Sequence, residues 1–450
     1  MNIRFGTARR CINPQVPVSL AGYFNVRMWD QILDDLEVRA VVFKHGPDYA
    51  AILNVDLVTV PLFICDGIFA ALQEMGITAL TRENTLIDAI HTHTGPEIRP
   101  IQGHNPAYFP YFVKQAAEAL AEAFQSLRDG ELFYGQTEDN RFLFNRRYWM
   151  KDGKVLTNPG KLNPDIVRPE GEIDPDIPLL GIKSGNKLEV VLCSIVNHTD
   201  TIGGNGVSAD WPGFLRRTIE KEMGPNSMFC TMIGASGNIN HFDVRTDMNQ
   251  TCYAEAERIG LGYAETILKA LSGLQKVEGD FFKVIHGEAN TTAREISKEE
   301  VAAAQEVVDK YADLEIGEGT DMTSEDLANG APVVLKYFAK ELLNRAANKE
   351  KYRFFLTGFA FGSSVIIASL PSEPFTEIGL ILRREIFKNR VCLVAALANG
   401  TGSYLNAGGY IPNAWNYGRG GYETQPRSNP FSMGCASDIL NKWREIAKDL

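Results

Sequence analysis

Short apolar runs alternate along the chain with segments whose apolar residues recur at helical spacing. The runs predict strands at residues 3–9, 38–44, 50–57, 86–90, 188–196 and 228–233, and the helical spacing predicts helices at 61–75, 111–127 and 253–274. A strand, a helix and another strand in this order are typical of βαβ units. The pattern therefore predicts an α/β fold, with a mixed β-sheet core and helices on its faces.

Two segments depart from this alternation. Residues 297–352 are charged, helical in pattern and rich in Ala, Glu and Lys, so we expect a helical insertion or lid there. Residues 140–178 lack periodicity and carry several prolines, which indicates a long loop. Strands are predicted again after the helical segment, at residues 352–361, 365–370 and 391–397.

Composition narrows the class of protein. The net charge of −11 disfavours binding to nucleic acid or to an anionic membrane, since both need clustered Lys and Arg. No apolar run is long enough to span a bilayer, and the N-terminus lacks the apolar core of a signal peptide, so we expect a cytoplasmic protein. The seven cysteines are scattered without a CxxC motif, and no disulfide framework is expected.

Two histidines follow one predicted strand. In His91-Thr92-His93-Thr94-Gly95-Pro96 they lie two residues apart, and Gly95-Pro96 turns the chain. Residues i and i+2 of a strand point to the same face, so the two imidazoles are expected to project together. Strand ends are where α/β sheets open ligand crevices, and imidazole is the commonest metal ligand. The alternative is a pair of structural histidines.

Polar side chains also follow the ends of other predicted strands. They are His198, Asn238 and Asn240, Glu373, and Tyr404. Separate strands that deliver imidazoles, a carboxylate and an oxygen donor to one edge indicate a catalytic zinc site with an open position for water. His241 is a competing candidate ligand. Because the candidates come from both halves of the chain, we expect one catalytic domain over residues 1–450.

These motifs resemble the neutral, non-lysosomal ceramidase family. His91-Thr92-His93-Thr94-Gly95-Pro96 is similar to that family's HTHSGP stretch, and Leu370-Pro371-Ser372-Glu373 with Thr376 to its LPGEFT. Further similarities follow in the same order along the chain: Leu20-Ala21-Gly22-Tyr23, Val38-Arg39-Ala40, Asn54-Val55-Asp56, Asn145-Arg146, Ser208-Ala209-Asp210 with Gly213, Leu397-Ala398-Asn399 with Tyr404, and Gly421-Tyr422-Glu423. The resemblance covers the family's catalytic region, and we expect no counterpart of its C-terminal immunoglobulin-like domain.

The resemblance implies a zinc amidase that cleaves the N-acyl bond of sphingoid bases by attack of a metal-bound water. It implies that Zn²⁺ is bound by His91, His198, Glu373 and Tyr404. It further implies that substrate is oriented, and the oxyanion stabilised, by His93, Arg146 and Tyr422. Where the family carries a serine considered catalytic, this chain has Asn240.

Three classes of function stay open at this point. The first is a zinc hydrolase of an N-acyl amide, and the second is a zinc hydrolase of an ester or lactone of a small polar substrate. The third is a binding protein that retains the metal without catalysis. This class stays open because Asn240 replaces the family's serine. The expected partner is a small molecule, an acyl amide or a lipid, and aromatic residues are available for an acyl groove: Tyr23, Phe24, Phe109, Tyr111 and Trp415.

Overall fold

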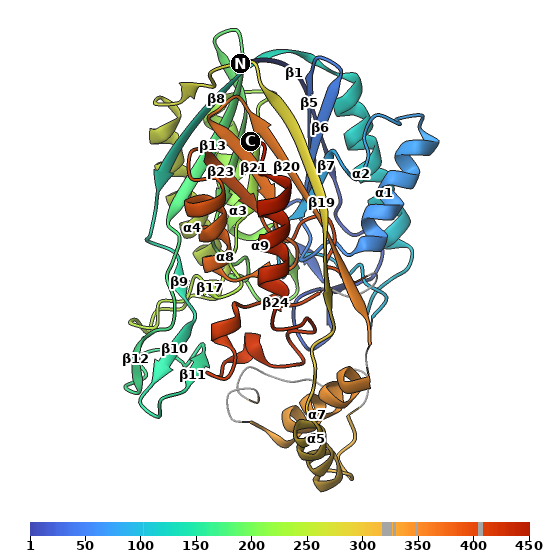
Figure 1. Cartoon of the computed structure of the whole chain (residues 1–450), viewed down its shortest axis with the longest axis vertical. Helices are drawn as coiled ribbons and strands as arrows, with labels where there is room; N and C mark the ends of the chain where they lie inside the picture. Colours follow the sequence, from blue (N-terminus) through green and yellow to red (C-terminus); the bar gives the residue numbers. More distant parts are fainter. Residues whose placement is uncertain (102, 317–325, 327–329, 348, 404–407) are drawn as a thin grey trace.

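Two β-sheets pack face to face, and helices cover the outer face of each, so the fold has four layers (Figure 1). The structure is a computed structural model that describes residues 1–101, 103–316, 326, 330–347, 349–403 and 408–450. The α/β class with a mixed sheet, predicted from the apolar pattern, is confirmed. The pattern did not predict that the strands divide between two sheets.

The larger sheet contains both βαβ units that lead to the site. Its strands, in ladder order, are β16 (Met228–Ile233), β14 (Lys187–Ile195), β13 (Asp176–Ser184), β8 (Arg128–Glu138), β1 (Asn2–Cys11), β5 (Glu37–His45), β6 (Asp48–Val55) and β7 (Thr85–Ala89), with β18 (Gln275–Lys276) on β8. The pairs β6–β7 and β14–β16 are parallel, and the other pairs are antiparallel. Each parallel pair is joined by a helix, and the sequence pattern predicts the one between β6 and β7.

The smaller sheet supplies the third strand end of the site. Its strands, in ladder order, are β19 (Phe282–Thr292), β20 (Lys351–Phe361), β21 (Val365–Ser369) and β23 (Val391–Ala395), of which β21 and β23 are parallel. Side chains from the facing strands meet between the sheets, for example Phe43 and Phe361, whose ring centres are 5.2 Å apart. Burial of alternate residues on both sheets makes this layer the apolar interior.

Helices cover both outer faces. The larger sheet is covered by α1 (Leu62–Glu74), α2 (Tyr108–Gln125), α3 (Asp210–Met223) and α4 (Tyr253–Leu271), and the smaller by α8 (Thr376–Ile381), the π-helical turn η1 (Leu382–Ile386) and α9 (Cys435–Ile446). Two further helices, α5 (Lys298–Lys310) and α7 (Pro332–Ala347), lie together at the lower end of Figure 1. They belong to the segment 297–352, for which the sequence predicts a helical insertion.

Short strands and turns build the loops around the site. They are β2 (Ser19–Leu20), β3 (Arg27–Met28), β4 (Gln31–Ile32), β9 (Phe144–Asn145), β10 (Arg147–Met150), β11 (Val155–Thr157), β12 (Ile166–Pro169), β15 (Gly206–Val207), β17 (Ile239–Asn240), β22 (Glu373–Pro374), β24 (Tyr410–Ile411), and the 3₁₀ turns η2 (Ala414–Asn416) and η3 (Tyr422–Thr424). The prediction of a long loop over residues 140–178 is therefore wrong. That segment contains four short strands. β10 pairs with β11 and β12 inside the segment, and β9 pairs with the distant β17.

The segment after β23 joins the two ends of the larger sheet. The N–H of Ala396 donates to the carbonyl of Ile233 in β16 at 2.7 Å, and the N–H of Asn399 donates to that of Ile87 in β7 at 2.8 Å. The Asn54 amide of β6 also donates to the Thr231 carbonyl of β16 at 3.0 Å. Strands from opposite ends of the ladder therefore lie close together, and so do the loops that follow them.

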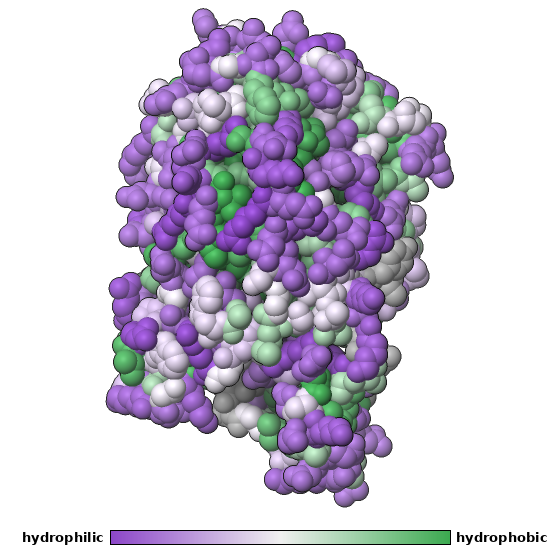
Figure 2. All heavy atoms as spheres, viewed as in Figure 1, coloured by the Kyte–Doolittle hydropathy of each residue, from purple (hydrophilic) through white to green (hydrophobic). Residues whose placement is uncertain are grey.

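The surface is mainly polar. Polar side chains cover most of the face drawn in Figure 2, with smaller apolar areas between them. Within the described ranges, none of the helices combines the length and apolar character that a bilayer crossing requires.

Asp88 carries a buried carboxyl near the end of β7. It is 0% exposed and accepts one hydrogen bond, from the Asn54 amide at 2.7 Å, while its Oδ1 has no hydrogen-bond partner. Burial raises the pKa of Asp88 to about 8. The folded state therefore holds a proton that the unfolded chain releases near its ordinary pKa of 3.8, so stability falls as pH rises between these two values.

We predict that Asp88→Asn stabilises the fold at pH about 8 and changes stability little at pH about 4. The amide keeps the shape and neutral state of the protonated acid, and each unit of pKa shift corresponds to about 1.36 kcal/mol. Urea unfolding at both pH values measures the effect. Asp129→Asn, at an exposed carboxylate, is the control; equal curves for Asp88→Asn and the unchanged protein would contradict the prediction.

Candidate metal centre and surrounding site

The side chains of the two histidines in the HxH motif lie close together. They are positioned by a turn after the strand and not, as the sequence predicts, by the alternation of side chains along it. β7 ends at Ala89, and His91 has a left-handed φ of 64°. The Nδ1–H of His91 donates to the carbonyl of Val58 at 2.7 Å, which turns its Nε2 toward the Nε2 of His93, 3.3 Å away. A hydrogen bond at Nδ1 fixes the tautomer and leaves Nε2 free to bind a metal.

Neighbouring segments hold this turn rigidly. The Thr92 and Thr94 hydroxyls both donate to the carbonyl of Ser208, at 2.7 and 2.9 Å. Gly22, at φ 97°, passes so close to the His93 ring that a Cβ atom would overlap its Nδ1. A left-handed backbone and the absence of a side chain are both needed here, which accounts for glycine in Leu20-Ala21-Gly22-Tyr23.

His198 comes from the end of β14 and completes a cluster of three imidazoles. Its ring centre lies 4.5 Å from that of His91 and 5.3 Å from that of His93. One nitrogen from each ring can be chosen so that all three lie within 4.8 Å of one another. The Trp211 indole N–H donates to the His198 carbonyl at 2.9 Å and fixes the backbone after the strand. His241, the competing candidate, binds the Gln250 carbonyl through Nε2 and is not part of this cluster.

Glu373 brings a carboxylate to the same place. It follows β21, and its Oε2 lies 3.5 Å from the Nε2 of His91. Burial alone would raise the pKa of Glu373, but His91 and Arg146 beside it hold the pKa below its ordinary value. Burial and the neighbouring imidazole lower the pKa of both His93 and His198. The carboxylate is therefore charged and these imidazoles neutral, the forms that bind metals.

The donor set fits a metal ion. Three buried atoms of the cluster have no hydrogen-bond partner among the described residues: His93 Nδ1, His198 Nδ1 and Glu373 Oε2. Burying a polar group without a partner costs free energy, which a bound cation would offset. Imidazole nitrogens with one carboxylate oxygen are the ligands typical of catalytic zinc.

Arg146 supplies a fixed positive charge next to this cluster. Its Nε donates to Glu423 Oε1 at 2.8 Å, and its Nη2 donates to the Gly237 carbonyl at 2.8 Å. Its guanidinium carbon lies 5.0 Å from the centre of the Tyr410 ring. Its neighbours more than offset the effect of burial and raise the pKa of Arg146, so it stays charged. Although the sequence places Arg146 in a polar loop, its side chain is buried, with 6% exposed.

A tyrosine that sequence reasoning missed lies beside Glu373. β22 and β24 pair in parallel, with Glu373 opposite Tyr410. The Tyr410 ring centre is 5.7 Å from that of Tyr422, the third residue expected to contact substrate. Tyr404, the tyrosine expected as a ligand, lies outside the described residues. Spacing alone could not choose between Tyr404 and Tyr410, because both follow Asn399 in a Gly-rich loop.

Asn240 is engaged in its own loop. Its amide nitrogen donates to Asn158 Oδ1 at 2.7 Å, and its Oδ1 accepts from the Phe242 N–H at 3.1 Å. It is 4% exposed and lies in β17, which pairs with the strand before Arg146. In this arrangement Asn240 supports the loop that carries Arg146.

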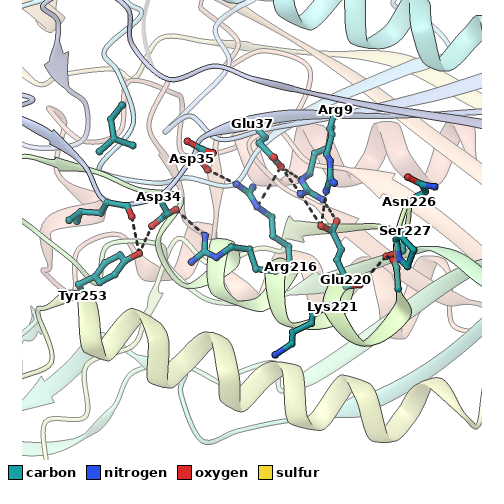
Figure 3. Close-up of a pocket in the computed structure, with 16 residues that line it drawn as sticks. Arg9, Asp34, Asp35, Glu37, Arg216, Glu220, Lys221, Asn226, Ser227 and Tyr253 are labelled. Carbon is teal, nitrogen blue, oxygen red and sulfur yellow. Dashed lines mark hydrogen bonds and ion pairs between the residues drawn. The ribbon is translucent and has the colours of Figure 1, made fainter.

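A cavity of about 920 Å³ lies beside α3 and the start of β5 (Figure 3). Arg9 and Arg39 both pair with Glu220, and Glu37 lies between Arg39 and Arg216. Because these charges pair with one another, they account for the attachment of α3 to β5 and do not indicate a ligand.

Comparisons with known proteins place the fold. No protein-family model matches the chain, and no curated protein matches it. The neutral ceramidase from Pseudomonas aeruginosa is similar in structure, with a TM-score of 0.73 and 17% sequence identity over 99% of this chain and 74% of that one. A ceramidase complexed with C2 gives a TM-score of 0.72 and 18% identity over 99% of this chain and 75% of the other. The chain therefore has the neutral ceramidase fold, which confirms the resemblance at the level of fold.

We predict that Glu423→Gln destabilises the protein by about 3 kcal/mol, the usual cost of breaking a buried ion pair. Glu423 is 0% exposed and accepts hydrogen bonds from Arg146, Arg147 and Thr157 at 2.7–2.8 Å. A neutral amide cannot accept all three or neutralise the two arginines. Urea unfolding at neutral pH measures the change.

Glu172→Gln is the matched control for that variant. Glu172 pairs with Arg384 at the surface, where both side chains are more than half exposed. Such pairs contribute about 1 kcal/mol or less. Equal stability of the two variants would show that the Glu423 network does not hold Arg146.

Proposed function

We propose that this chain is a zinc-dependent hydrolase that cleaves an N-acyl amide bond. The observation that carries the proposal is the buried cluster of His91, His93, His198 and Glu373 beside the charged Arg146. In this cluster His93 Nδ1, His198 Nδ1 and Glu373 Oε2 have no hydrogen-bond partner among the described residues. The ceramidase fold supports it, because the solved protein of that fold bears the name of an amide-cleaving enzyme.

The zinc ligands in this proposal are His91, His198, Glu373 and Tyr410. Tyr410 takes the role first expected of Tyr404, because it lies opposite Glu373 in the β22–β24 pair. A zinc ion bound there supplies a Lewis acid and lowers the pKa of water. The hydrogen bond from His91 Nδ1 to the Val58 carbonyl orients that ligand.

The other residues of the site hold charge and move a proton. The Arg146 guanidinium, with Tyr422 nearby, stabilises the negative oxygen that forms when the amide carbonyl is attacked. The neutral His93 accepts at Nε2 a proton from the attacking water and passes it to the leaving nitrogen of the amide. Asp200 Oδ1 lies 3.7 Å from His93 Nδ1, which is too far for a hydrogen bond but close enough to stabilise the positive charge of the protonated ring. Tyr23, which donates a hydrogen bond to Asp200, keeps that carboxylate in position.

We predict that the purified protein holds about one zinc per chain, and that His91→Ala loses most of it. Removing one ligand from a catalytic set leaves too few donors for tight binding. Elemental analysis by mass spectrometry after dialysis measures zinc per chain, and circular dichroism checks that the variant is folded.

His286→Ala is the control for metal content. His286 is exposed in β19 and lies in the smaller sheet, outside the cluster. It should retain all the metal. Full zinc occupancy in a folded His91→Ala variant would rule out the assigned ligand set.

We predict that the zinc-loaded protein hydrolyses N-acyl amides faster than the matched esters and lactones, measured against each compound's uncatalysed rate. Arg146→Lys should lower kcat about a hundredfold, since loss of one oxyanion donor typically costs this much. Product release followed by mass spectrometry gives both results. Hydrolysis confined to esters or lactones would favour the second class of function, and zinc binding without any hydrolysis would favour the third.

A further inference from the structure

Aromatic rings enclose a second arginine near the site. The guanidinium carbon of Arg427 lies 3.2 Å from the ring centre of Phe338 in α7, 4.5 Å from that of Tyr422 and 4.9 Å from that of Phe24. Three segments distant in sequence therefore converge on one cation: the N-terminal loop, the helical segment 297–352 and the loop after η3.

The hydrogen-bond donors of this cation are largely unused. Arg427 Nε and Nη2 are buried without a hydrogen-bond partner, and no ion pair to Arg427 occurs among the described residues. Burial lowers the pKa of Arg427 to about 10, which still leaves it charged at neutral pH. Aromatic faces attract the charge of a guanidinium but offer no lone pair to its in-plane N–H groups. Buried donors of a charged group without acceptors indicate a missing anionic partner.

A further arginine increases the positive charge at this place. Arg345 of α7 donates from Nη2 to the carbonyl of Arg427 at 2.7 Å, and its own Nε is buried without a partner. Burial raises the pKa of the nearby Tyr337 hydroxyl, and the charges of both guanidinium groups lower it. The charge of Glu341 raises the pKa of Arg427, but the two side chains form no ion pair. Neither Arg427 nor Arg345 forms an ion pair with a carboxylate among the described residues, although acidic residues outnumber basic ones and give the chain a net charge of −11.

This cation lies one ring beyond the proposed metal centre. Tyr422 contacts Arg427 on one side, and its ring centre is 5.7 Å from that of Tyr410 on the other. Tyr410 in turn lies opposite Glu373. The rings of Tyr422 and Tyr410 therefore link Arg427 to the proposed metal centre.

We propose that Arg427, assisted by Arg345, binds an anionic group, a carboxylate or a phosphate, carried by the N-acyl amide substrate. This assignment rests on the proposed function and specifies its substrate class. The planar guanidinium binds both anions with two parallel hydrogen bonds, and Phe24 and Phe338 supply apolar surface for adjoining methylene groups. Ceramides carry no such charge, so the preferred substrate differs from ceramide.

The test compares three N-octanoyl amides of similar length: those of ethanolamine, β-alanine and O-phosphoethanolamine. They are neutral, a carboxylate and a phosphate, so the second and third arms distinguish the two anions. With the zinc-loaded protein, at least one charged compound should exceed the neutral one in kcat/KM by about ten- to a hundredfold, the usual effect of a hydrogen bond to a charged group.

Variants assign that preference to Arg427. Arg427→Met should bring the ratio of charged to neutral kcat/KM close to one, while Arg427→Lys, which keeps the charge but loses the two-pronged geometry, should retain part of it. Arg384→Met, at an exposed arginine paired with Glu172, should leave the ratio unchanged. Equal kcat/KM values for all three amides, or an unchanged ratio in Arg427→Met, would overturn the proposal.

Binding separates this proposal from the proposed function. Calorimetry on the His91→Ala protein should show tighter binding of a charged amide than of the neutral one, and Arg427→Met in that background should remove the difference. If the difference appears but the zinc-loaded protein hydrolyses none of the three amides, the amidase assignment fails and recognition of the anion stands. If amides are hydrolysed but bind alike, the amidase assignment stands and the role of Arg427 fails.

Discussion

The backbone hydrogen bonds made by residues 396–399 determine where the site forms. They connect Ile233 at the end of β16 with Ile87 of β7, the two strands at opposite ends of the nine-stranded ladder. The segment itself continues from β23 of the smaller sheet. One short turn, in which Leu397 and Asn399 have left-handed φ angles of 55° and 57°, thus joins both ends of the larger sheet to the smaller one. His91, His198 and Glu373 meet because the loops after β7, β14 and β21 open at this junction.

Charge inside the junction is balanced pair by pair. Glu423 compensates Arg146 and Arg147, and Asp56 compensates Arg216 through two hydrogen bonds of 2.6–2.8 Å. Removing one partner from such a pair is far more costly than losing a surface pair. Arg427 departs from this rule, since within the described part of the chain its guanidinium contacts aromatic rings and forms no ion pair. That contrast within one molecule is the reason to interpret Arg427 as functional rather than structural.

Sequence reasoning found the parts of the site that depend on local pattern. A polar residue directly after a buried strand is visible in the sequence, so His91, His198 and Glu373 could be predicted from it as members of one site. Contacts that depend on long-range pairing could not. β19 pairs with β20 across the helical segment, and β24 pairs with β22. The residues near each strand contain no pattern from which the partner or the register could be predicted. For that reason the sequence alone did not place Tyr410 opposite Glu373.

Asn240 stands where the resemblance to neutral ceramidases leads us to expect a serine. Its side-chain amide is hydrogen-bonded to Asn158 and to the backbone of Phe242, so this residue supports its own loop. In the proposed function, amide cleavage at this centre would depend on water activated by a bound zinc ion and on the charge of Arg146. The centre and its three strand ends belong to the layered core, whereas Arg427, Phe338 and Phe24 come from loops and from α7. In the two proposals taken together, substrate is selected by segments outside the core, and the metal ligands are positioned by hydrogen bonds within it.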